Sequence, residues 1–439
     1  MPRHGSSVEA NAPAATTTGT SGWLERYSRR LLERQLSGLT GGTITIVVDG
    51  NARTFGSQTG SHDLQSVVTV HDSRFYSETV LGGCIGAAEA YMRGYWSCDD
   101  LTSLLRLLVV NSEVEERVQS YWAKLLKKPI QRVLHLLQRN TRRGSQENIA
   151  AHYDLGNDVF MLFLDETMMY SCALFANDDH SLREAQIAKN DRICKKLQLS
   201  ANDHVLEIGT GWGGFAIHAA GHYGCRITTT TISEAQYQLA TQRITDAGLA
   251  ARVQVIQQDY RDLKGQYDKL VSIEMIEAVG HAFLDQYFAA CSRLLKPDGQ
   301  MLIQAITLQD QSHDEYLRGV DFIQRYIFPG GCLPSMSSMA LSTKRASDLQ
   351  LYHVEDWTPH YARTLHCWRD RFLGNADQMR ALGRPEWFIR LWDFYFCYCQ
   401  AAFLERQTQS VQLMFVKPRC RRRSLTPALI ESVAEAVTC

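Results

Sequence analysis

The alternation of apolar and polar positions predicts two kinds of structure along this chain of 439 residues. Near the start, "TITIVVDGNARTFG" (43–56) has the pattern of two strands around an Asp49–Gly50 turn, and "LTSLLRLLVV" (101–110) that of an apolar helix. From about residue 151, helical spacers separate the strand-like runs "HVLEI", "RITTTTI", "VQVIQQD", "DKLVSIEM" and "QMLIQAIT". This alternation predicts an α/β fold with a mainly parallel sheet and helices on both faces.

These patterns divide the chain into five predicted regions. Residues 1–22 hold few large apolar groups, so they cannot offset the entropy of ordering and are expected to form a disordered tail. Residues 23–112 are predicted to form a small α+β domain, 113–148 a basic helical linker and 149–418 the α/β domain. Residues 419–439 are predicted to be a flexible basic tail.

Composition and charge narrow the class of protein. Hydrophobic residues make up 45% of the chain and charged residues 21%, which is enough to build a buried core. The net charge of -1 gives no overall attraction to nucleic acid, so we expect no such partner. Twelve cysteines without a C-x-x-C pair favour a reducing compartment and no metal site. Because no signal peptide or membrane span is apparent, we expect a cytoplasmic protein.

The predicted linker leaves two interpretations open. From Arg117 onward it carries basic residues and no acidic one, and a basic amphipathic helix can lie against anionic lipid head groups. A solvated helix face would have the same pattern. The basic residues concerned are Lys124, Lys127, Lys128, Arg132, Arg139, Arg142 and Arg143.

The turn in "HVLEIGTGWGGFA" (204–216) predicts a nucleotide-type ligand. Closely spaced glycines between a strand and a helix let backbone amides approach a ligand at the carboxyl ends of the strands. A dinucleotide site requires an acidic residue at the end of the next strand. That strand ends in "TTTTIS", which contains no carboxylate. Glu207 instead gives E-x-G-x-G, and Asp259 ends the third strand, which resembles the S-adenosylmethionine site of Rossmann-like methyltransferases. A tight strand-helix turn with a buried glutamate is the alternative.

Several ordered blocks make the resemblance more specific. They are "NIAAHYDLGNDVFMLFLDETMMYSCALF", "SIEMIEAVG", "FIQRYIFPGGCLPS", "HYARTLHCWRDRF" and "LWDFYFCYCQAAFLER". Between about residues 149 and 417 the chain resembles the cyclopropane-fatty-acyl-phospholipid synthase family and its mycolic-acid relatives. The resemblance implies a Rossmann-like class I methyltransferase domain with a helical lipid-binding insertion, and the small N-terminal domain resembles that of the family too.

The resemblance also implies site residues. S-adenosylmethionine would contact Tyr170, Ser171, Glu207, Gly209, Gly211, Gly213, Thr231, Ile232, Gln236, Asp259, Tyr260 and Arg261. In the family, the cofactor's methyl group is transferred to a cis double bond of an acyl chain, and bound bicarbonate then removes a proton. Positions that hold this bicarbonate match Cys172, Glu277, Ile306 and Tyr361, and Cys399 matches a cysteine long regarded as an active-site residue. Aromatic residues expected to shelter the carbocation are Phe160, Phe163, Tyr316, Tyr326, Phe328, Tyr361 and Trp368.

Three positions depart from the family pattern. Glu274 and Ala278 stand where well-known synthases have Gly and His, and Gln304 stands where they have a bicarbonate-binding His. Gln304 can still donate a hydrogen bond, so we expect it in the anion site, but it cannot carry charge. Glu274 would repel an anion unless it were protonated or turned away. The resemblance therefore leaves two products open, a cyclopropane ring and a methyl branch.

We therefore expect an enzyme that methylates unsaturated acyl chains of phospholipids in the bilayer. It would associate peripherally with an anionic membrane surface and could form a homodimer, as the family often does. Two alternatives are an N-methyltransferase for a small amine and a catalytically silent lipid-binding protein. Taken alone, Cys172 and Tyr361 could be ordinary core residues, and Glu277 a carboxylate at a helix start.

Overall fold

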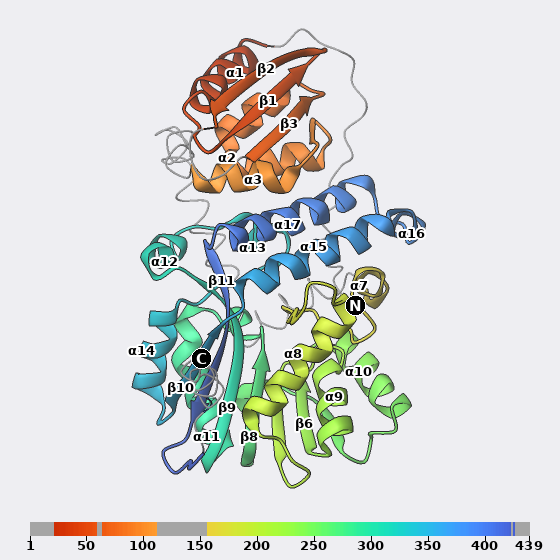
Figure 1. The fold of residues 1–439 in the computed structure, drawn as a ribbon, viewed down its shortest axis with the longest axis vertical. Helices are drawn as coiled ribbons and strands as arrows, with labels where there is room; N and C mark the ends of the chain where they lie inside the picture. Colours follow the sequence, from red (N-terminus) through yellow and green to blue (C-terminus); the bar gives the residue numbers. More distant parts are fainter. Residues whose placement is uncertain (1–21, 59–63, 112–155, 423–424, 426–439) are drawn as a thin grey trace, which may run out of the picture.

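The computed structural model describes residues 22–58, 64–111, 156–422 and 425. It contains a four-stranded sheet near the N-terminus and a seven-stranded sheet, with a layer of helices between them (Figure 1). The predicted linker at 113–148, nearly all of the predicted N-terminal tail and most of the C-terminal tail lie outside the described residues.

The N-terminal unit contains the predicted hairpin and helix. Strands β1 and β2 pair antiparallel with Val48 opposite Asn51, and Asp49 and Gly50 both have positive φ (48° and 78°), as a two-residue hairpin turn requires. The predicted apolar helix is α3, so both predictions are confirmed. The sheet order is β2-β1-β3-β4. The elements are α1 (Trp23–Leu36), β1 (Gly42–Val48), β2 (Asn51–Ser57), β3 (Leu64–Val70), α2 (Arg74–Met92), β4 (Trp96–Cys98) and α3 (Leu101–Val110).

The larger sheet has the order β10-β11-β9-β8-β5-β6-β7. Strands β5 to β9 are parallel and confirm the five predicted strands, while β11 and β10 add an antiparallel edge that the pattern did not predict. Because β6 and β8 flank β5 on opposite sides, the strand order reverses at β5, and sheets of this kind bind ligands at the carboxyl ends of the strands at that point. The strands are β5 (His204–Ile208), β6 (Arg226–Thr231), β7 (Val253–Gln257), β8 (Tyr267–Ile273), β9 (Leu295–Leu308), β10 (Gln350–Asp356) and β11 (Thr408–Val416).

Helices cover both faces of this sheet. Ile193, Phe215 and Ile244 of α8, α9 and α10 pack on one face, and Phe288 and Met339 of α11 and α14 on the other. This agrees with the predicted α/β architecture. The bounds are α7 (Asn157–Phe163), α8 (Leu182–Leu197), α9 (Gly214–Tyr223), α10 (Glu234–Asp246), α11 (Leu284–Leu294) and α14 (Met336–Ala346).

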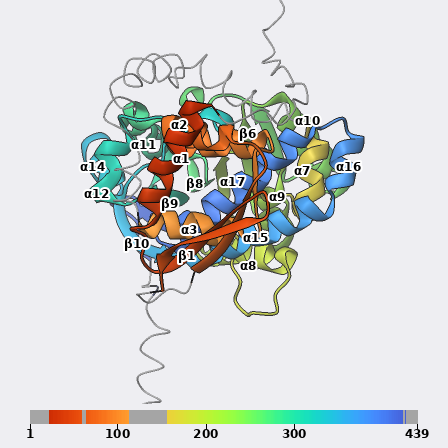
Figure 2. The same ribbon diagram turned by 90° about the horizontal axis from the view of Figure 1, so that it is seen from above.

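A helical layer lies over the carboxyl ends of the strands. Its longest helices, α15 and α17, pack against each other and lie beneath the N-terminal unit when seen from above (Figure 2). Tyr91 of α2 donates a hydrogen bond to Asp393 of α17 at 2.6 Å, and Arg106 of α3 pairs with Glu405 at 2.6 Å. Among the described helices, none is long and apolar enough to cross a membrane. The layer comprises α12 (Asp310–Tyr316), α13 (Phe322–Tyr326), α15 (Thr358–Gly374), α16 (Ala376–Ala381) and α17 (Glu386–Leu404).

Candidate active site

The glycine turn after β5 opens onto a cavity. Gly209, Gly211 and Gly213 all have positive φ (100°, 52° and 84°), which side chains rarely adopt. No heavy atom lies within 4 Å of the position that a Cβ on Gly211 would take, whereas one on Gly209 would lie 3.2 Å from Met275. The turn therefore presents bare backbone to the space beyond β5.

The cavity has a volume of about 640 Å³ and brings most of the predicted residues together. Every predicted cofactor contact lines it except Gly213, which precedes α9. Of the predicted catalytic residues, Glu277, Ile306, Tyr361 and Cys399 line it. Cys172 and Gln304 do not line it and lie fully buried behind its wall. Strand ends and helical layer thus enclose one continuous space.

The end of the cavity near β5 is ordered by its own hydrogen bonds. Glu207 is buried and accepts a hydrogen bond from Thr229 Oγ1 at 2.6 Å, and burial raises the pKa of its carboxyl group to about 8. Asp259 pairs with Arg261 at 2.6 Å in the short helix η1 (Tyr260–Asp262), and Thr231 Oγ1 donates to Gln236 Oε1 at 2.8 Å. A buried carboxyl group that can accept hydrogen bonds, beside bare backbone amides that donate them, suits a polar ligand with both donor and acceptor groups.

Glu274 is the centre of the polar wall. It follows β8, and its carboxyl group accepts three hydrogen bonds: from Cys172 N at 2.9 Å, from Gln304 Nε2 at 2.8 Å and from Tyr361 Oη at 2.7 Å. Its φ of 47° is left-handed, a conformation that costs a non-glycine residue about 1–2 kcal/mol. The fold therefore holds this glutamate in place against a local strain.

A chain of side chains fixes the direction of the Gln304 amide. Lys196 can only donate, and its Nζ donates to Gln412 Oε1 at 2.8 Å. Gln412 Nε2 in turn donates to Gln304 Oε1 at 2.9 Å, which leaves Gln304 Nε2 to donate to Glu274. Sequence reasoning missed Lys196 and Gln412, because these two partners are 216 residues apart along the chain.

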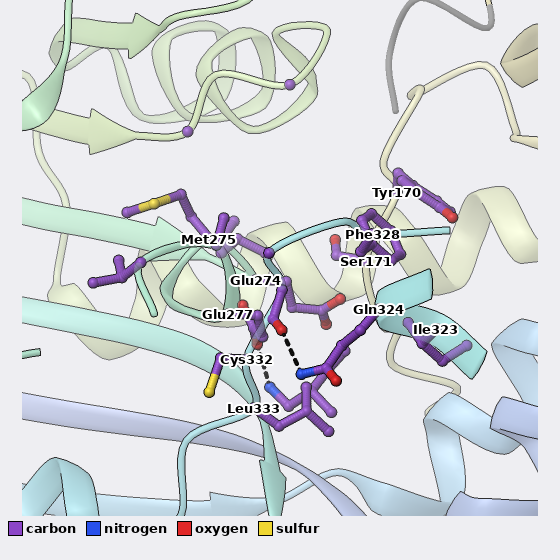
Figure 3. Close-up of a pocket in the computed structure, with 18 of the residues that line it drawn as sticks. Tyr170, Ser171, Glu274, Met275, Glu277, Ile323, Gln324, Phe328, Cys332 and Leu333 are labelled. Atoms are coloured by element: carbon purple, nitrogen blue, oxygen red, sulfur yellow. Dashed lines mark hydrogen bonds between the residues drawn. The ribbon is translucent and has the colours of Figure 1, made fainter. Parts of the chain in front are cut away.

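Glu277 lies beside Glu274 in the same wall (Figure 3). It belongs to the short helix η2 (Ile276–Ala278), and Ile306 N donates to its Oε1 at 2.5 Å. Its Oε2 has no hydrogen-bond partner among the described residues. Burial and the nearby Glu274 raise the pKa of Glu277 to about 8, so this carboxyl group is protonated at neutral pH.

Glu274 is the member of the pair that carries the charge. Burial raises its pKa too, but hydrogen bonds from Tyr361, Gln304 and Cys172 and the charge of Lys189 oppose the rise. Two adjacent carboxylates cannot easily both ionise, and the one with three donors is favoured. We therefore assign the negative charge to Glu274 and the proton to Glu277.

Lys189 is a buried cation behind this wall that sequence reasoning missed. It lies on α8 with no exposed surface, and its Nζ donates to Ser171 Oγ at 2.9 Å. Burial lowers its pKa to about 8, while the nearby Glu274, Cys172, Asp165 and Glu207 act against that shift. Lys189 is therefore a counter-charge for the buried carboxyl groups around the cavity.

The prediction of a bicarbonate site does not fit these contacts. The donors expected to hold the anion, Cys172 N, Gln304 and Tyr361, all hold the carboxyl group of Glu274. Ile306 N donates to Glu277. Glu274 was expected to turn away or repel an anion, and instead it takes the hydrogen bonds that an anion would need.

Aromatic and apolar side chains make up much of the remaining lining. Tyr361 stacks on Phe403 with ring centroids 4.4 Å apart, and Tyr170 stacks on Phe328 at 6.2 Å. Cys399 lies on the α17 side of the cavity, and burial raises the pKa of its thiol, so it is neutral and unsuited to act as a nucleophile.

Only part of the predicted aromatic set reaches this space. Tyr316, Phe328 and Tyr361 line the cavity. Tyr326 donates a hydrogen bond to Glu89 at 2.5 Å instead. Phe160, Phe163 and Trp368 are buried in the core.

The fold and the glycine turn define the class: this is a class I S-adenosylmethionine-dependent methyltransferase. Residues 140–413 match the family model described as mycolic acid cyclopropane synthetase, and the chain belongs to that family.

Two curated relatives and a solved structure agree with this. The chain is 41% identical to tuberculostearic acid methyltransferase UfaA1 of Mycobacterium tuberculosis, over 73% of this chain and 76% of the relative. It is 36% identical to cyclopropane-fatty-acyl-phospholipid synthase of Escherichia coli, over 79% and 87%. The structure of mycolic acid cyclopropane synthase CmaA1 complexed with SAH and CTAB superposes with a TM-score of 0.58 at 33% identity, over 62% and 98%.

Proposed function

We propose that this enzyme transfers the methyl carbon of S-adenosylmethionine to the cis double bond of unsaturated acyl chains in phospholipids and closes a cyclopropane ring. One observation carries the proposal. The cavity that begins at Glu207 and the glycine turn continues into an aromatic space bounded by Phe328, Tyr361 and Phe403. The carboxyl groups of Glu274 and Glu277 lie in its wall. A small amine would not need so large an apolar space.

The residues suit the first step of this chemistry. An alkene is a weak nucleophile, so it must lie in line with the sulfonium methyl, and ideal alignment supplies about 7–11 kcal/mol. The C–S bond breaks as the new C–C bond forms, and a carbocation is left in the acyl chain. The faces of Phe328, Tyr361 and Phe403 can stabilise that cation and exclude water.

A methyl-branched product is the second candidate. The 41% identity to a tuberculostearic acid methyltransferase favours it, and the first step would be the same. In both cases a proton must leave the chain or the new methyl group. A saturated methyl branch requires a hydride donor in addition, so the two products differ after methyl transfer rather than during it.

We propose further that the enzyme meets its substrate at an anionic bilayer. The outward face of α1 carries Trp23 (74% exposed) and Tyr27 (57%), with Arg30 and Arg34 at helical spacing on the same stripe. Aromatic residues beside basic ones are typical of helices that lie in the lipid interface. The basic residues of the predicted linker would add to this attraction.

The experiment that tests the proposed function uses labelled S-adenosylmethionine and vesicles of unsaturated phospholipid. We expect the acyl chains to gain the mass of one CH2 unit. A ring product resists mild bromination, whereas an unsaturated methylene product consumes bromine. Unchanged lipid with a methylated soluble amine would instead support an N-methyltransferase.

A further inference from the structure

Glu274 occupies a position where its backbone conformation is strained. Its backbone is left-handed with φ of 47°, where glycine is the natural choice. The carboxyl group of Glu274 accepts hydrogen bonds from three separate parts of the chain, at Cys172, Gln304 and Tyr361. Such convergence at a strained residue points to function rather than packing.

The three donors are themselves held in place. Gln304 is fixed through Gln412 by Lys196, and Tyr361 is anchored in α15 and stacked on Phe403. The third donor is the backbone of Cys172, so it needs no side-chain positioning. Donors that need no rearrangement keep Glu274 in its carboxylate form until the proton transfer.

We propose that Glu274 is the proton acceptor of the reaction, a carboxylate built into the chain in place of the bicarbonate expected from the family resemblance. This rests on the proposed function. After methyl transfer the sulfur keeps the electron pair of the broken C–S bond. A C–H bond then breaks, its electron pair closes the ring or forms a C=C bond, and the proton goes to Glu274, which becomes neutral.

The surroundings favour Glu274 over Glu277 for this role. Glu277 is the protonated member of the pair and cannot accept a further proton, whereas Glu274 is ionised and lines the cavity. The other titratable groups around Glu274 are Glu277, Tyr361, Cys172 and, behind the wall, Lys189. Among these Lys189 supplies the positive charge.

The test compares three variants with wild type in buffer freed of bicarbonate. Wild type should keep its full rate. Glu274→Gln should lose about 100-fold or more, which is the contribution of a general base. Glu274→Gly removes the carboxyl group and the backbone strain together, so it should fold, lose the same activity and regain part of it when bicarbonate is added. Glu166→Gln, an exposed glutamate, is the matched control and should change nothing.

A binding measurement separates this inference from the proposed function. Carbon-13-labelled bicarbonate should bind Glu274→Gly, as seen by NMR, and should not bind wild type, whatever the lipid substrate proves to be. Bicarbonate binding to wild type, or loss of wild-type rate when bicarbonate is removed, would overturn the inference. So would a Glu274→Gln variant with normal turnover. Failure of wild type to methylate any unsaturated lipid would contradict the proposed function alone.

Discussion

Replacing Lys189 with methionine removes the buried counter-charge and should move the pH dependence of the reaction. Lys189 lies near Glu274, Cys172, Asp165, Glu207 and, on α9, His218, and it forms no ion pair within 4 Å among the described residues. A cation in direct contact shifts a carboxyl pKa by about 1–3 units, so at this longer range we expect about one unit.

The direction follows from the role of Glu274. A base must be ionised, so activity rises with pH as Glu274 loses its proton. Without the cation its pKa rises, and the acid limb of the profile of kcat/KM against pH should move to higher pH. At a pH below that limb, one unit corresponds to about a tenfold loss of rate, or about 1.4 kcal/mol.

The assay measures kcat/KM from about pH 4.5 to 9 for wild type, Lys189→Met and Lys189→Arg, so that the range begins near the ordinary pKa of a glutamate. The arginine variant keeps the charge and should keep the wild-type limb if it folds, which thermal unfolding checks. A uniform loss of rate in Lys189→Met at every pH, with no displacement of the acid limb, would refute the electrostatic role and leave a structural one.

Gly211→Val should abolish cofactor binding, measured by calorimetry, because the side chain fills the open space beside the glycine turn. Gly248→Val is the control: its positive φ of 70° imposes similar backbone strain, and cofactor binding should be kept. Equal loss of binding in both variants would contradict the cofactor site at the glycine turn. Glu277→Gln should weaken the pH dependence of stability, because a pKa raised to about 8 makes the free energy of unfolding fall as pH rises from about 4.5 to 8; an unchanged slope would contradict the assignment. The double variant Trp23→Ala, Tyr27→Ala should sediment less with anionic vesicles than wild type. Unaltered sedimentation would show that α1 does not contact the bilayer.

Local structure could be predicted from the sequence where apolar and polar residues alternate along an element, or where a turn requires glycine. The hairpin at 43–56 is marked by its Asp49–Gly50 turn, and the five parallel strands by their apolar runs. Edge strands β10 and β11 were not predicted. Five of the seven residues of β10 are exposed, so its sequence lacks the apolar run that marked the inner strands.

The site was predictable only as a set of positions. Cofactor positions followed from the glycine turn and the family blocks, yet the partners of Glu274 could not be inferred, because Tyr361 is 87 residues away and Cys172 contributes its backbone. Lys189 looks like any polar position in "EAQIAKNDRICKK" until α8 is packed against Ser171. The contacts of Glu274 and Lys189 join residues that are distant along the chain, so their roles could not be predicted from local sequence patterns.

The most direct test of the central claim is to supply S-adenosylmethionine with a fully deuterated methyl group to vesicles of monounsaturated phospholipid. We predict acyl chains that gain the carbon and keep two of its deuterons, because one C–D bond of the new group is broken to close the ring. A product that keeps all three deuterons would contradict ring closure. Lipid without any label would contradict the proposed function itself.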